Sequence, residues 1–145
     1  MDTHFGGTDT VRRLLATSLL LFGVYATWAQ DAKDDTPAAA ATRKLLQNKI
    51  SVDYEDTLLQ QVAEDLATQV QGLKTKIDTN SGASVNSKIT FKSKNKTLAE
   101  TLDEMGKKYD LGYIVISKEY KTFKKFDGYL LIVKGSERGF PSKGK

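Results

Sequence analysis

The chain has 145 residues, of which 28% are charged, a formal net charge of +4 at pH 7 and no cysteine. The length suits one folded domain, and the absence of cysteine excludes a disulfide framework, a thiolate metal site and a lipid-modified cysteine anchor. His4 is the only histidine, and it lies in a segment that we expect to be cleaved. We therefore predict no metal, no cofactor and no histidine general base in the folded protein.

Residues 1–29 are predicted to be a signal peptide. Arg12 and Arg13 precede the apolar run Leu14–Ala26, and Thr27 to Ala29 supplies small residues before a cut after Ala29. This charged, apolar, small-residue order is typical of secretory signals, and the apolar run is shorter than a membrane-spanning helix. We expect an exported protein, periplasmic or extracellular. An uncleaved membrane anchor and a buried helix of the domain are the alternatives, and membrane contact is expected only if the segment is retained.

Residues 30–49 are predicted to be a linker followed by a short helix. Thr36 suits the N-cap of this helix, and Pro37 suits its first position, where a missing N–H costs nothing. The alanine-rich run Ala38–Asn48 continues the helix.

A strand and an amphipathic helix follow. Ile50–Tyr54 alternates apolar and polar residues, which is the period of a half-buried strand. We expect the helix to begin at Thr57 and to end at Gly72, and Leu73–Thr79 to form a short strand before a loop. The apolar stripe of this helix comprises Leu58, Leu59, Val62, Ala63, Leu66 and Val70.

The same order of elements then recurs. Lys88–Lys92 alternates, a second helix is expected from Thr97, and Tyr113–Ile116 and Tyr129–Val133 are the strongest strand signals in the chain. Because these two runs are apolar on successive residues, both faces of each strand should be covered. Residues 136–145 have no periodicity and are predicted to be a disordered tail. The second helix places Leu98, Leu102, Met105 and Tyr109 on one face.

Both predicted helices begin with the same pattern. Thr57-Leu58-Leu59-Gln60 and Thr97-Leu98-Ala99-Glu100 each place a Thr three residues before Gln or Glu, as in a reciprocal capping box. We predict an α+β domain over residues 50–135 in which two helices pack with two small β-sheets in βαββαββ order, preceded by the short N-terminal helix.

A family resemblance covers the chain from Ile50 to Lys134. It rests on five segments: Ile50–Leu58, Lys88–Phe91, Thr97–Leu102, Tyr109–Tyr113 and Tyr129–Ile132. Together they resemble the secretin and TonB short N-terminal domain (the STN domain), in which a strand–helix unit precedes a "Thr-Leu" helix, a "Gly-Leu-x-Tyr"-like strand and a final hairpin. The resemblance implies a two-helix, two-sheet sandwich that makes protein–protein contacts in the bacterial envelope. Leu59 departs from the pattern at a position where Pro is common.

The segment Lys118–Gly128 is longer than its hairpin requires. It interleaves three aromatic residues with three lysines, and the chain from 118 to 145 has eight basic against three acidic residues. Such a segment can bind an envelope protein or an anionic envelope polymer, or stack on nucleobases, although export disfavours nucleic acid. Alternatively, the aromatic residues cover the sheet and the lysines are solvated. The candidate partner-binding residues are Tyr120, Lys121, Phe123, Lys124, Lys125 and Phe126.

No candidate catalytic residue emerges. The available carboxylates lie on the polar sides of the predicted helices, where charged residues are expected for solvation. We therefore predict a non-enzymatic protein–protein interaction module, with a small exported hydrolase and a polyanion or nucleic-acid binder as alternatives. The carboxylates considered are Glu64, Asp65, Glu100, Asp103 and Glu104.

Overall fold

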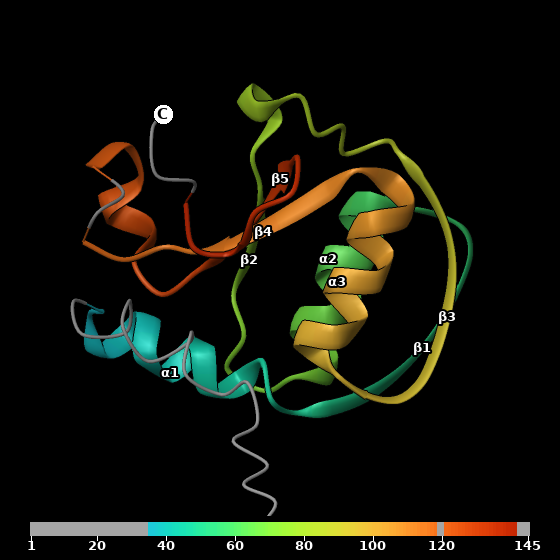
Figure 1. Ribbon diagram of the computed structural model, residues 1–145, viewed down its shortest axis with the longest axis horizontal. Coiled ribbons are helices and arrows are strands. Elements are labelled where there is room, and N and C mark those ends of the chain that lie inside the picture. The colour runs from blue at the N-terminus through green and yellow to red at the C-terminus, as the bar shows by residue number, and fades with distance from the viewer. Residues whose placement is uncertain (1–34, 119–120, 142–145) are drawn as a thin grey trace, which may run out of the picture.

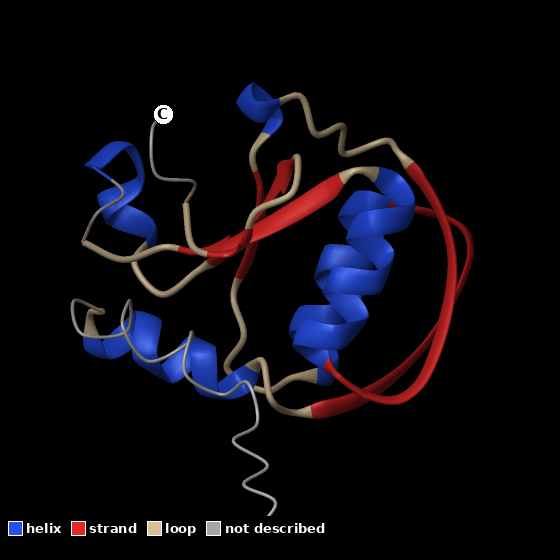
Figure 2. Ribbon diagram, viewed as in Figure 1, coloured by secondary structure: helices blue, strands red, loops and turns tan. Residues whose placement is uncertain are grey.

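The computed structural model describes residues 35–118 and 121–141 (Figure 1). This part of the chain is a mixed α+β fold with three α-helices and two small β-sheets, which confirms the expected class (Figure 2). The predicted signal peptide lies outside the described residues. The elements are α1 (Pro37–Leu45), β1 (Lys49–Leu58), α2 (Leu59–Gln69), β2 (Thr75–Ile77), the 3₁₀ turn η2 (Thr79–Ser81), β3 (Lys88–Thr97), α3 (Leu98–Tyr109), β4 (Leu111–Val115), the 3₁₀ turn η3 (Lys121–Phe126), β5 (Leu130–Lys134) and β6 (Arg138–Gly139).

The two sheets enclose the helices. β1 and β3 form an antiparallel two-stranded ribbon, and the second sheet has the strand order β2-β5-β4-β6. Helices α2 and α3 lie between the ribbon and this second sheet (Figure 1). The apolar stripes of both helices are buried, because neither helix alone can remove its stripe from water. The core between the layers includes Ile50, Leu59, Leu66, Ile89, Leu98, Met105, Leu130 and Ile132.

The second sheet is covered on both faces. Every residue of β4 and the first four residues of β5 are buried, as their continuous apolar runs indicated. The inner face contacts the helices, whereas η3 supplies aromatic side chains to the outer face. Helix α1 joins the structure through Thr42, whose hydroxyl donates to the C=O of Gly128. The hydroxyl of Thr36 caps α1 by accepting a 3.1 Å hydrogen bond from the N–H of Ala39.

The units β1–α2 and β3–α3 are related by an internal pseudo-twofold axis. The axis passes through the pair Asp53–Lys92, so that each residue of the first unit corresponds to one 39 positions later. Both strands bend at a residue with a left-handed backbone, Asp56 (φ 50°) in β1 and Asn95 (φ 54°) in β3. These irregularities let each strand continue to its helix, so both strands are longer than the alternation alone indicated. When the two units are exchanged, each cross-strand pair of the ribbon falls on another such pair. The partners Lys49 and Thr97 become Leu58 and Lys88, Ile50 and Lys96 become Thr57 and Ile89, and Val52 and Ser93 become Tyr54 and Phe91.

The N-cap of α2 lies one residue later than the sequence predicted. Leu58, rather than Thr57, is the N-cap and is the equivalent of Thr97. The hydroxyl of Thr57 donates instead to the C=O of Glu55, over 3.2 Å. The predicted capping box, Thr57 with Gln60, was therefore wrong by one residue, because the left-handed bend at Asp56 in β1 moves the helix start to the next position. At Thr97 the predicted box is confirmed.

The chain after residue 135 differs from the expectation of a disordered tail. Arg138–Gly139 forms β6, which pairs in parallel with β4, and residues 142–145 lie outside the described part. Arg138 forms an ion pair with Asp103 and donates to the C=O of Leu111 over 3.1 Å. Arg43 of α1 donates to the C=O of Gly139 over 2.8 Å. These contacts join residues distant in sequence, so local periodicity does not reveal them.

Candidate functional site

The connection between β4 and β5 is closed at its base by backbone hydrogen bonds. The N–H of Ile116 donates to the C=O of Tyr129 over 2.9 Å, and the N–H of Gly128 donates to the C=O of Ile116 over 2.8 Å. Gly128 has φ 79°, and a Cβ atom there would lie 2.8 Å from the Cβ of Ala38 in α1. Helix α1 therefore packs against the base of the predicted partner-binding segment. This close approach requires glycine at position 128.

Aromatic residues of this connection cover the outer face of the sheet. Phe123, Phe126 and Tyr129 are half-buried and pack against four buried residues of the sheet region. The Phe126 and Tyr129 rings meet edge to face, with centroids 5.3 Å apart, and the Phe123 and Phe126 centroids are 6.2 Å apart. Both separations lie in the range of favourable aromatic pairs. The buried residues beneath are Ile114, Ile116, Leu131 and Val133.

The predicted partner-binding residues therefore divide into groups. Phe123 and Phe126 pack on the sheet, as the alternative interpretation of this segment expected, while part of each side chain remains exposed. Lys125 is exposed. Tyr120 lies outside the described residues, and the side chains of Lys121 and Lys124 are likewise not described.

Two lysines that the sequence analysis missed complete a surface here. Lys76 places its Nζ atom 4.5 Å from the Phe126 centroid, and Lys125 places its own 5.1 Å from the same ring. The Nζ atom of Lys74 lies 5.6 Å from the Tyr129 centroid. We call Lys74, Lys76, Lys125, Phe126 and Tyr129 the aromatic–lysine cluster. The only sequence signal for Lys74 and Lys76 was their weak alternation in a short strand, and the parallel pairing of β2 with β5 brings them beside η3.

The three lysines of the cluster have no carboxylate partner in the described part of the chain. Seven ion pairs occur there, and none involves Lys74, Lys76 or Lys125. Cation–π contact at an exposed site is worth only about 0.5–1 kcal/mol, and it leaves the ammonium charge unneutralised. The cluster thus presents three positive charges around apolar ring edges.

The carboxylates considered as candidate catalysts have structural partners. Glu100 accepts a 2.8 Å hydrogen bond from the N–H of Thr97, which holds the pKa of that carboxyl below its usual value. Asp103 pairs with Lys107 and Arg138, and the Lys107 hydrogen bond is the largest cause of its lowered pKa. The remaining contacts pair Glu104 with Lys96, Glu64 with Gln60, and Asp65 with both Tyr54 and Gln69.

A second surface lies on the other side of the helix layer. It is a groove of about 430 Å³ between β1 and α2. The Tyr54 hydroxyl donates to Asp65 over 2.7 Å at this groove, and burial, followed by that hydrogen bond, raises the pKa of Tyr54. The residues that line the groove are Ser51, Val52, Asp53, Tyr54, Thr57, Gln61, Asp65 and Gln69.

Comparison with known proteins adds no assignment to these surfaces. No protein-family model, curated protein or solved structure matches the chain. Within residues 35–118 and 121–141, no group of three or more metal-ligating side chains comes together, and no helix is both long and apolar enough to cross a membrane.

Proposed function

We propose that this protein is a non-enzymatic, exported interaction module of the bacterial cell envelope that binds another envelope protein. The proposal includes the STN-like arrangement, in which a βαββαββ unit follows a short N-terminal helix. It rests on one observation, the aromatic–lysine cluster. Three lysines that have no carboxylate partner among the described residues surround half-buried rings on one side of the molecule.

The chemistry of the cluster favours an acidic protein segment as the partner. Rings held by packing lose little conformational freedom on binding, and aromatic side chains dominate interface energetics. Lysines at the rim of such a patch attract carboxylates and accelerate encounter with the partner. Lys76 comes from β2 and Lys125 from η3, so a partner that contacts both lysines bridges two separate elements.

The decisive experiment compares two charge-matched triple variants. One variant carries Lys74→Gln, Lys76→Gln and Lys125→Gln. The control replaces three exposed lysines outside the cluster, Lys44, Lys49 and Lys94, with Gln. Native envelope proteins cross-linked to each mature variant are identified, and association rates with the captured partner are measured at several salt concentrations. We expect slower association and a flatter salt dependence for the cluster variant alone. Equal effects of both variants would show attraction by net charge and contradict the proposal.

Binding of an anionic polymer is the second candidate, since the same three lysines would serve it. A mixed-sequence single-stranded oligonucleotide and an anionic envelope polymer are the probes, with the same two variants. If these probes bind with the affinity expected of a protein partner, and no protein is captured by cross-linking, the anionic polymer is favoured as the partner. The five carboxylates considered as candidate catalysts are engaged in a helix cap, hydrogen bonds and ion pairs, so we do not propose the hydrolase.

Export is part of the proposal and is tested separately. The order of residues from Arg12 to Ala29 predicts a mature N-terminus near Gln30. The intact mass of the native protein measures where the chain begins. A full-length chain recovered from the cytoplasm would contradict both the localisation and the class of partner.

A further inference from the structure

The two outer edges of the ribbon are equivalent under the pseudo-twofold axis, and the edge of β3 is closed by side chains. The N–H of Thr90 donates to the hydroxyl of Tyr109 over 2.7 Å, and that hydroxyl donates to the C=O of Thr90 over 2.8 Å. The ammonium group of Lys108 donates to the same C=O over 2.7 Å. Residues at the end of α3 therefore satisfy the outward backbone groups of β3, which protects an edge strand from pairing with another chain.

Ser51 is the residue of β1 that corresponds to Thr90. The Ser51 hydroxyl oxygen accepts a 3.0 Å hydrogen bond from the N–H of Asn95, and the Thr90 hydroxyl oxygen accepts one of the same length from the N–H of Asp56. Each residue thus contacts the left-handed bend of the opposite strand. The backbone groups of Ser51 therefore point outward from the ribbon, as those of Thr90 do. Because backbone direction alternates along a strand, Asp53 shares this outer edge with Ser51.

The edge of β1 lacks the closure that β3 has. The position that corresponds to Tyr109 is Val70, which is 1% exposed and belongs to the core. The position that corresponds to Lys108 is Gln69, whose amide donates to Asp65 instead. In the described part of the chain, no side chain bonds to the backbone N–H or C=O of Ser51. The outer edge of β1 is therefore open.

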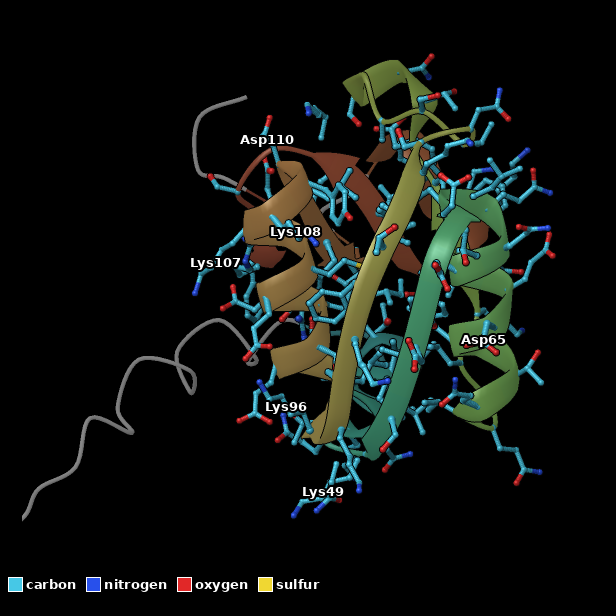
Figure 3. All side chains as sticks on the ribbon, turned by 90° about the vertical axis from the view of Figure 1, so that its right-hand side faces the viewer. Lys49, Asp65, Lys96, Lys107, Lys108 and Asp110 are labelled. Atoms are coloured by element: carbon cyan, nitrogen blue, oxygen red, sulfur yellow. The ribbon has the colours of Figure 1, made fainter. Side chains whose placement is uncertain are left out.

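The groove of about 430 Å³ runs along this open edge. Figure 3 shows β1 flanked by α2, which carries Asp65, whereas β3 is flanked by α3, which carries Lys108. The lining of the groove contains the carboxylates of Asp53 and Asp65 and no lysine or arginine. Asp53 forms an ion pair with Lys92 of β3, whereas Asp65 accepts hydrogen bonds from Tyr54 and Gln69 and has no ion pair in the described part of the chain. An open edge beside a polar, negatively charged groove is suited to an extended peptide that carries basic side chains.

We propose that the outer edge of β1 binds an extended segment of a partner protein as an added β-strand. The backbone of this segment pairs with Ser51 and Asp53, and its basic side chains reach Asp65. Charge favours a basic segment over a second copy of this chain, because the groove lining of a second copy supplies no lysine or arginine to pair with Asp65. The site lies across the helix layer from the aromatic–lysine cluster, so the two surfaces are independent (Figure 1).

The probe is a synthetic peptide of about eight residues in which lysine alternates with threonine and valine, so that one face of the strand is basic. Backbone amide chemical shifts and hydrogen exchange of the mature protein are followed during titration. We expect shifts centred on β1 and α2, with slowed exchange of the Ser51 and Asp53 amides. A peptide N-methylated at alternate residues keeps its charge but lacks the paired N–H groups, and we expect it to bind at least about fivefold more weakly.

The protein offers a matched pair of variants. Ser51→Pro removes the outward N–H of the open edge, and Thr90→Pro removes its equivalent at the closed edge. Each also loses one hydroxyl contact to the opposite bend, and Thr90→Pro additionally loses the N–H that donates to Tyr109, so the urea midpoint of each variant is measured beside its peptide affinity. We expect Ser51→Pro to weaken the peptide at least about fivefold, and Thr90→Pro to leave its affinity within about twofold. Asp65→Asn should weaken the lysine peptide but not a serine-substituted one.

Several results would overturn the proposal. Equal binding of the N-methylated and unmethylated peptides would show that no strand is added. Shifts centred on β2 and η3 would move the peptide to the aromatic–lysine cluster. Absence of binding at millimolar peptide would reject the site even if the proline variants fail to fold. A concentration-dependent dimer that Ser51→Pro abolishes would assign the edge to a second copy and refute the partner that we propose.

Discussion

The starts of α2 and α3 are equivalent under the pseudo-twofold axis, yet only one has a complete side-chain cap. At α3 the Thr97 hydroxyl accepts from the N–H of Glu100 over 3.2 Å, and the Glu100 carboxylate accepts from the N–H of Thr97 over 2.8 Å. At α2 the N-cap is Leu58, which has no polar side chain, and only the return bond from its N–H to Gln61 is present, at 3.4 Å.

Both helix starts share a different device, a pair of backbone hydrogen bonds from the other half of the repeat. The N–H of Leu59 in α2 donates to the C=O of Ser87 over 2.8 Å, and the N–H of Leu98 in α3 donates to the C=O of Asn48 over 2.9 Å. The next residue of each helix donates similarly. The chain before each strand thus satisfies the N–H groups that open the other helix. The comparison shows that tertiary backbone contacts define both starts, and that the capping box is an addition to one of them.

The largest expected effect tests whether the two halves share one core equally. Leu66 and Met105 occupy equivalent positions and are 0% and 2% exposed. We expect Leu66→Ala and Met105→Ala each to lower the free energy of unfolding by about 2–5 kcal/mol, because each opens a cavity in the shared core. Urea denaturation measures this loss. The exposed equivalents Thr68→Ala and Lys107→Ala are the controls and should stay within about 0.5 kcal/mol of wild type. A large loss in only one helix would contradict a shared core.

The next effect concerns a position where the halves differ in backbone contact. A Cβ atom at Gly106 of α3 would lie 2.2 Å from the C=O oxygen of Leu111, whereas the equivalent position in α2 is Ala67. We expect Gly106→Ala to destabilise the protein by about 1–3 kcal/mol, since the clash outweighs the gain of about 1 kcal/mol in helix propensity.

Ala67→Gly is the reciprocal change. It should cost only about 0.5–1 kcal/mol, which is the ordinary propensity difference. Thermal and urea unfolding of both variants measure the contrast. A Gly106→Ala protein more stable than wild type would mean that α3 does not approach β4 as closely as the structure shows.

A smaller difference in stability is expected between alanine variants of Thr97 and Thr57. Thr97→Ala should cost about 0.5–2 kcal/mol, because it removes the acceptor for a helix-start N–H. Thr57→Ala should cost less than about 0.5 kcal/mol, because its hydroxyl bonds only to a strand C=O and caps nothing. Parallel urea melts decide between these outcomes. Equal losses of stability in both variants would show that Thr57 caps α2, as the sequence pattern indicated, and would contradict Leu58 as the N-cap.

The smallest expected effect is on acid sensitivity, which the structure places in α3. The pKa of Asp103 lies below its ordinary value of 3.8, chiefly through the Lys107 hydrogen bond, and the pKa of Glu100 lies below 4.5. Because a lowered carboxyl pKa stabilises the folded state only while the group is ionised, stability should fall as the pH drops below about 4.5. Urea midpoints measured from pH 6 to 2 should show a shallower decline for Asp103→Asn than for wild type. An unchanged slope would remove Asp103 from this role.

Local pattern was sufficient where one element carries its own signal. The helical stripes through Leu66 and Met105 and the apolar runs of β4 and β5 were identifiable because burial imposes a fixed period on each element. The Thr97 box was identifiable because both of its partners lie within four residues. The capping box predicted at Thr57 was wrong, because the left-handed backbone at Asp56 moves the helix start. The order of side chains along the sequence does not indicate such a bend.

The sequence by itself determined the α+β class, the two amphipathic helices and the long aromatic and basic connection after β4, because these depend on periodicity and composition. Only the tertiary structure decided which side chains meet. Parallel pairing of β2 with β5 brings Lys76 to Phe126, and the pseudo-twofold axis sets Ser51 of the open edge against Thr90 of the closed one. Contacts between residues so far apart in sequence follow from strand order and register, and no local pattern encodes either.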